Sequence, residues 1–273
     1  EKSRKLDIGV EIGLFNSLNI IFDWFKEKRS GIFMQRTSLP STFGMSGITP
    51  WANIGKVDNS GVDISVDYNK AFSKDLILSL RGTFSYAHNE IVEMDEPKYK
   101  WAYQYKAGHP INSIQCLIAE GLFRDEEEIA SSPSQDIYAT TYPIRPGDVK
   151  YRDLNRDGRI DDYDRTYQLY AAVPEIYYGF SVELKYRGFG VSAYFQGVAH
   201  STLETTLSSI YQPLYGNDRN VSEYYMEHRW SRFNTEGRYP RLTTLANGNN
   251  YTQSSLWTEN GNFLKLRTLQ AYY

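Results

Sequence analysis

Hydrophobic and polar residues alternate along several stretches of the chain. In the first stretch, residues 6–14, every even position is aliphatic and every odd position is small or acidic. A period of two is typical of a β-strand with one apolar face. The same alternation predicts strands over 18–28, 62–68, 76–86, 178–186 and 189–196, and a seventh strand that starts near residue 262 and includes 263–266.

The links between the predicted strands fall into two length classes. Three are short, at 16–17, 69–75 and 187–188, and three are long, at 30–57, 88–172 and 198–260. An up-and-down outer-membrane barrel has short turns at one rim and long loops at the other. Soluble β-sandwiches rarely separate loop lengths in this way. The sequence therefore favours an all-β chain, a transmembrane antiparallel up-and-down β-barrel with long extracellular loops.

The charged residues support this interpretation, because a charge that faces lipid at mid-bilayer costs about 2–4 kcal/mol for Arg or Lys. In the body of six predicted strands the charges lie opposite the aliphatic face, at Asp7, Glu11, Asp23, Asp63, Asp67, Arg81, Glu183 and Lys185. Lys26 and Lys28 continue the aliphatic face only where the second strand runs out. A soluble β-sandwich remains an alternative, since its strands also alternate where one face meets the core. Single-chain bacterial barrels use an even number of strands, so seven strands predict a piece of a larger barrel.

The composition narrows the choice of partners. The 273 residues carry 30 basic and 33 acidic side chains, a net charge of -3, which favours no nucleic acid. The 23 Tyr, 13 Phe and 5 Trp residues point to interfaces, sugars or a membrane girdle. The lone Cys116 excludes an internal disulfide and a zinc cluster. No run approaches the ~20 apolar residues of a membrane helix, and the first residues lack the layout of a signal peptide.

Short motifs follow one another in a specific order along nearly the whole chain. They are Asn53-Ile54-Gly55-Lys56-Val57, Gly108-His109-Pro110-Ile111, Glu120-Gly121-Leu122-Phe123, Glu126-Glu127-Glu128-Ile129, Pro146-Gly147-Asp148-Val149-Lys150-Tyr151, Asp153 to Asp161, Tyr186-Arg187-Gly188-Phe189 through Gly197, Arg229-Trp230 and Tyr239-Pro240-Arg241-Leu242. Each motif alone is weak evidence for a family, but the order in which they follow one another is specific. On these residues the chain resembles the C-terminal barrel region of SusC-like (SusC/RagA) TonB-dependent outer-membrane transporters.

The resemblance implies a fold, a location and partners. Such transporters are 22-stranded barrels of the bacterial outer membrane, surrounded by lipid and with an N-terminal plug in the lumen, and barrels of this strand number do hold plugged lumens. TonB energises them through a periplasmic TonB box, and a SusD-like surface lipoprotein opens like a lid over glycan or peptide substrates. Residues 1–273 would be the C-terminal portion of the barrel, with the plug domain and the closing strands absent.

One segment, residues 153–164, carries explicit metal chemistry. Oxygen donors at its positions one, three and five and a glycine at position six reproduce the first half of an EF-hand-type loop. Position twelve is an Asp where a calcium loop usually has a longer, bidentate Glu. We expect a calcium ion there and no organic cofactor, with Asp153, Asn155, Asp157, Arg159 through its carbonyl, Asp161 and Asp164 as ligands. The alternative is an Asx-rich turn whose side chains cap their own backbone.

The remaining candidates do not indicate an enzyme. His88, His109, His200 and His228 lack metalloprotease spacing, and neither a G-x-S-x-G elbow nor a GxxxxGK[ST] phosphate loop is present. The acidic run at 126–128 favours a solvated helical turn over a glycosidase pair. Aromatic rings in the long loops offer surfaces for sugars or a lid protein, although most such rings pack loops together: Trp51, Trp101, Tyr103, Tyr105, Tyr211, Tyr215, Tyr224, Tyr225 and Trp257.

The sequence therefore predicts active nutrient import across the outer membrane, by binding and release of an oligosaccharide or a peptide. Two alternatives stay open at this point. A soluble carbohydrate-binding β-sandwich with a calcium-stabilised loop would also be rich in Tyr and Trp. A passive porin-like channel would share the strand pattern without a plug or energy coupling.

Overall fold

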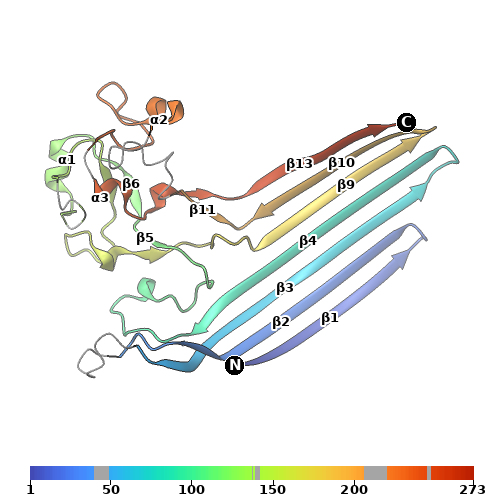
Figure 1. The fold of residues 1–273 in the computed structure, drawn as a ribbon, viewed down its shortest axis with the longest axis horizontal. Helices are drawn as coiled ribbons and strands as arrows, with labels where there is room; N and C mark the ends of the chain where they lie inside the picture. Colours follow the sequence, from blue (N-terminus) through green and yellow to red (C-terminus); the bar gives the residue numbers. More distant parts are fainter. Residues whose placement is uncertain (40–48, 137, 139–141, 206–219, 245–246) are drawn as a thin grey trace.

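A seven-stranded antiparallel sheet forms the frame of the computed structural model, which describes residues 1–39, 49–136, 138, 142–205, 220–244 and 247–273 (Figure 1). The strand order is β1-β2-β3-β4-β9-β10-β13, so every strand pairs with the next long strand along the chain. Their bounds are Lys2–Leu14, Leu18–Gln35, Trp51–Ala71, Leu76–Glu93, Ile176–Tyr186, Phe189–Ala199 and Phe263–Tyr272. All seven predicted strands are confirmed.

Short turns and long connections lie at opposite ends of this sheet (Figure 1). At one end, Phe15 and Asn16 have φ of 56° and 49°, and Arg187 and Gly188 have φ of 46° and 88°. Two consecutive residues with positive φ form the type I′ turn, whose twist matches that of the flanking strands. At the other end the sheet continues into the long loops, as the link lengths predict.

Several strands extend further toward the long loops than their side-chain pattern predicts. β2 runs to Gln35 and β3 begins at Trp51, so both ends of the predicted loop 30–57 are strand, and Trp51 lies in a strand rather than in a loop. In this outer part Lys28 pairs with Asp58, and their side chains form an ion pair of 3.5 Å. Polar residues occupy both faces there, so the alternation is lost while the backbone hydrogen bonds continue.

The sheet is a single layer with an uncovered apolar face. Leu6, Ile8 and Val10 on β1 are 54%, 52% and 49% exposed, and Val182 and Val191 on β9 and β10 are 40% and 52% exposed. Within the described residues, the sheet contributes only Ile91 and Val198, near its outer ends, to the buried hydrophobic residues. A sandwich buries this face against a second sheet, so the soluble β-sandwich alternative is wrong.

The hydrophobic core lies in the long loops, not beneath the sheet. One cluster contains Leu117, Val149, Tyr151 and Ile160, and a second contains Tyr225, Tyr239, Tyr251 and Trp257. Leu256 packs against both clusters. Segments from the two longest connections therefore fold into one body beyond the end of the sheet, which we call the loop body (residues 94–175 and 200–262, where described).

Short elements build the loop body. Residues 126–128, predicted as a helical turn, begin α1, and the Asp125 carboxylate accepts a hydrogen bond from the Glu128 amide at 2.8 Å as its N-cap. No helix among the described residues has the length and apolar character needed to cross a membrane. The elements are η2 (Ala102–Gln104), β5 (Gln115–Cys116), β6 (Ala119–Leu122), α1 (Glu126–Ser131), β7 (Val149–Tyr151), η3 (Asp162–Asp164), β8 (Thr166–Tyr167), β11 (Thr202–Glu204), α2 (Glu223–His228), α3 (Gly248–Tyr251), η5 (Ser255–Trp257) and β12 (Thr258–Asn260).

Candidate functional site

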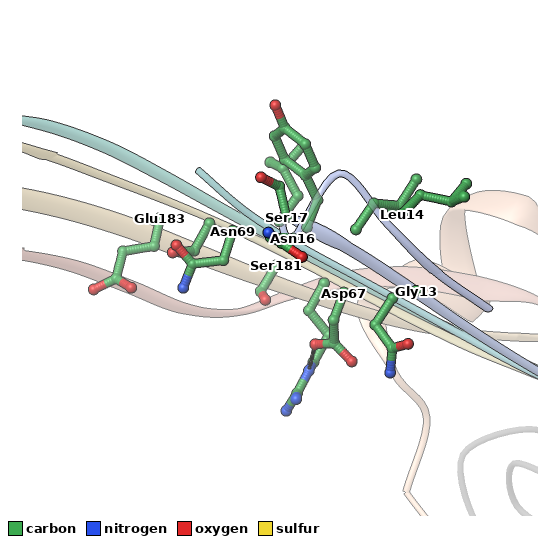
Figure 2. A pocket seen from close by; sticks show the side chains of 14 residues that line it. Gly13, Leu14, Asn16, Ser17, Asp67, Asn69, Ser181 and Glu183 are labelled. Atoms are coloured by element: carbon green, nitrogen blue, oxygen red, sulfur yellow. Dashed lines mark hydrogen bonds and ion pairs between the residues drawn. The ribbon is translucent and has the colours of Figure 1, made fainter. Parts of the chain in front are cut away.

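The face of the sheet opposite the aliphatic residues is polar, and we call it the polar face. Near the short turns it forms a hollow of about 730 Å³ lined by residues that include Asn19, Asp67, Arg81 and Glu183. Figure 2 shows Asp67, Ser181 and Glu183 leaving the strands on the same side. A second hollow of about 310 Å³ follows along the strands, with Asp23, Asp63, Ser65, Thr83, Ser85 and Gln196 among its lining residues.

Charges on the polar face are bonded across strands. Arg81 on β4 donates to the Asp67 carboxylate on β3. Glu183 on β9 accepts from the Tyr272 hydroxyl on β13 and lies 3.2 Å from the Lys185 ammonium. These ladders give a hydrophilic wall whose side chains are held in place by their neighbours. Such a surface suits the passage of a hydrated solute, because it offers hydrogen bonds without an enclosed, tight binding site.

A buried carboxylate, Asp148, organises the loop body. Its side chain is 1% exposed and accepts hydrogen bonds from Arg241 Nε at 2.7 Å, Asn250 Nδ2 at 2.9 Å, Asn247 Nδ2 at 3.1 Å and the Arg145 amide at 2.9 Å. A buried charge is tolerated only when it is paired and fully hydrogen-bonded. Asp148 therefore ties the segment before β7 to the segment around α3.

A second polar layer continues this network. Gln135 donates to the Val149 carbonyl at 2.9 Å and to Asn249 Oδ1 at 2.8 Å, and its own oxygen accepts from the Tyr151 amide at 2.8 Å. Asn249 is fully buried and also donates to the Val149 carbonyl. The sequence analysis did not identify this network. Its only signals were Asp148 within a family motif and the clustered asparagines at 247–250.

The predicted calcium loop is a compact set of Asx turns. Asp153 accepts from the amides of Arg156 and Gly158, Asn155 from that of Asp157, Asp157 from that of Arg159, and Asp161 from that of Tyr163. Among the described residues no group of three His, Cys, Asp or Glu side chains has an arrangement that would hold a metal ion. These bonds match the Asx-turn alternative, and calcium binding stays a prediction.

Asp164, the last residue of this loop, is fully buried and holds the loop closed. Its carboxylate accepts from the amides of Leu154, Asn155 and Asp161 at 2.8, 3.3 and 2.9 Å. Burial raises the pKa of this carboxyl, and the three amide donors act in the opposite direction. All six predicted ligands thus lie in one ordered loop, with Asp164 turned inward.

The predicted loop aromatics separate into several environments. Tyr225 and Trp257 are buried in the second cluster, Trp51 stacks on Phe33 at 5.0 Å, and Tyr105 packs edge-on against Tyr99. Trp101 and Tyr103 form a group with Tyr163, which the sequence analysis missed. Tyr224 is half exposed against His228, and Tyr211 and Tyr215 lie outside the described residues.

Among the described residues the four histidines do not gather in one place. His88 and His200 place their Nδ1 atoms 2.5 Å and 3.1 Å from the two oxygens of Glu175, where β4, β9 and β10 reach the loop body. His109 packs against Tyr167, and His228 Nδ1 lies 2.8 Å from the Tyr224 carbonyl. The histidine pair on Glu175 joins strand ends and was not predicted.

Taken together, an uncovered apolar face, a polar face with paired charges, and long loops at one end define the wall of a transmembrane β-barrel. No family model matches the chain. Two curated relatives come from Formosa agariphila. TonB-dependent receptor P3 is 25% identical over 289 residues, and TonB-dependent receptor P26 is 22% identical over 286 residues. Each match covers 100% of this chain and 27% of the relative, so the chain spans about a quarter of their length.

Solved structures give the same fold. The RagAB peptide transporter superposes with a TM-score of 0.70 at 18% identity, over 99% of this chain and 28% of that one. The RagAB peptide importer in its 'open-open' state gives a TM-score of 0.68 at the same identity and coverage. The chain is therefore similar to TonB-dependent receptors over its whole length, and it shares the fold of part of the RagAB peptide transporter.

The Asp148 network predicts a local loss of stability when the carboxylate is removed. Asp148→Ala in the full-length protein leaves Arg241 without its buried partner, which costs about 3–5 kcal/mol. Hydrogen exchange should then speed up at the amides of 147–151 and 247–251, while those of β2 and β3 keep their protection. The control is Asp136→Ala, because Asp136 is exposed and, within the part of the chain that the structure describes, its side chain bonds to Ser134 alone. Unchanged exchange in Asp148→Ala would contradict the role given to Asp148.

Proposed function

We propose that this chain is part of the barrel wall and outer loops of a TonB-dependent transporter, which imports oligosaccharides or peptides across the bacterial outer membrane. The observation that carries the proposal is the single-layer sheet, whose apolar face is exposed among the described residues and whose other face is polar. In lipid, a closed barrel satisfies every backbone group, and its outer face is apolar. The proposal does not involve catalysis.

The proposed partners are TonB, membrane lipid and a SusD-like surface lipoprotein above the loop body. The relatives' names as TonB-dependent receptors support the first, and the exposed aliphatic face supports the second. The fold shared with the RagAB peptide transporter supports a two-component assembly and keeps peptides beside oligosaccharides as substrates. The near-neutral charge balance gives no reason to expect nucleic acid.

Uptake in cells tests this proposal. Cells that carry only the full-length gene should take up its substrate, and uptake should stop when TonB is deleted. Val66→Arg turns a charge toward lipid in the middle of β3 and costs about 2–4 kcal/mol, so less folded protein and less uptake are expected. The adjacent Ser65→Arg faces the second hollow of the polar face and is the matched control for folding. Undiminished uptake without TonB would instead identify a passive porin-like channel.

We also propose that calcium binds the 153–164 loop and stiffens the loop body. The oxygen donors of Asp153, Asn155 and Asp157 lie on one short turn, and hard cations prefer such donors. Millimolar calcium should raise the unfolding temperature of the full-length protein in detergent, and Asp157→Ala should abolish the increase. The control variant Asp136→Ala should keep the calcium-dependent increase in unfolding temperature. Equal unfolding temperatures with calcium and with a chelator would leave the Asx-turn alternative.

A further inference from the structure

A groove of about 720 Å³ lies in the loop body, away from the polar face of the barrel. Four segments that are distant in sequence line it, and its side chains include Gln104, Gln115, Asp162, Tyr163, Arg165 and Gln253. We propose that this groove binds one ring of a neutral oligosaccharide, which stacks on Tyr163. The inference rests on the proposed function only in placing the loop body outside the cell.

Tyr163 lines one side of the groove and contacts two further aromatic residues. The Tyr163 side is open, because this residue is 55% exposed, and Trp101 supports it with a ring separation of 5.6 Å. Tyr103 stacks on Trp101 at 6.3 Å, and its hydroxyl donates to the Tyr163 carbonyl at 2.8 Å. Burial raises the pKa of Tyr103 to about 12, so this hydroxyl stays a donor. The C–H face of a sugar ring suits such a flat, supported aromatic surface.

The rest of the lining suits hydroxyl groups rather than ions. Arg165 Nε donates to Asp162 at 2.9 Å, and the second nitrogen of the Arg165 fork donates to Thr252 at 3.2 Å. The two opposite charges of the groove therefore neutralise each other. Gln104 is buried, and the side-chain amides of Gln115 and Gln253 offer donors and acceptors, as neighbouring sugar hydroxyls require. An ionic ligand would have to compete with the existing ion pair.

The groove is also preorganised. Asp164 accepts hydrogen bonds from three backbone amides, which holds its neighbours in place, Tyr163 within η3 and Arg165 as the C-cap of η3. On the opposite side, Gln253 donates to Glu204 at 2.6 Å. A site whose rings and polar groups are already placed loses little conformational freedom when it binds. The Asp-rich loop thus acquires a role, which is to present Tyr163.

Isothermal titration calorimetry on the full-length protein in detergent tests the groove. The probes are maltohexaose, cellohexaose and xylohexaose as neutral glycans, and hexaalanine as a peptide. At least one glycan should bind, and Tyr163→Ala should weaken its binding about tenfold, the scale expected for one lost stacking contact. Tyr163→Phe keeps the ring and should bind within about twofold of the original. The control Leu169→Ala changes an exposed residue outside the groove lining and should have no effect.

Three results would overturn the proposal. The first is that no glycan binds, although the unfolding temperature of the protein is unchanged. The second is equal glycan binding in Tyr163→Ala, and the third is that only hexaalanine binds in a Tyr163-dependent way. Binding is measured without TonB, so it is independent of transport. Tyr163-dependent glycan binding with TonB-independent uptake would support the groove and refute the proposed function. TonB-dependent uptake without Tyr163-dependent glycan binding would support the proposed function and refute the groove.

Discussion

The apolar face of the seven-stranded sheet is not covered by any other described part of the chain, and the rest of the structure depends on that fact. Residues such as Ile8, Val10 and Val182 are 40–52% exposed although they form a continuous aliphatic surface. In water such a face would drive aggregation, whereas in lipid it is the surface that a barrel wall requires. The polar residues are thereby left to face the interior, and they are the ones that pair across strands.

The loop body meets a different constraint, because it has to remain ordered without the sheet beneath it. Its stability comes from two small hydrophobic clusters and from the buried Asp148, which receives donors from segments about a hundred residues apart. The same body presents the groove around Tyr163. In the proposed function the two parts of the chain have different roles: the strands form a wall for passage, and the loops form a fixed surface for recognition.

The sequence predicted the parts of the fold that repeat with a period of two, and missed those that depend on distant contacts. The alternation did not predict the outer ends of β2 and β3, because polar side chains such as Lys28 and Asp58 occupy both faces there. Trp257 and Tyr225 were candidate ligand contacts, but they are the largest rings available to a small loop core and are buried in it. The bonds of Asn249 and Gln135 to β7 could not be inferred, since nothing local in the chain marks their partners.

The central claim is that alternate residues of each strand face lipid and a polar interior. It is tested most directly by nitroxide labels at single cysteines in the full-length protein, in a Cys116→Ala background reconstituted in bilayers. Labels at Val66 and Val191 should collide preferentially with oxygen dissolved in lipid, and labels at Ser65 and Ser192 with a water-soluble nickel complex. Equal access of the nickel complex to all four positions would contradict the account, because it would place both faces of the sheet in water.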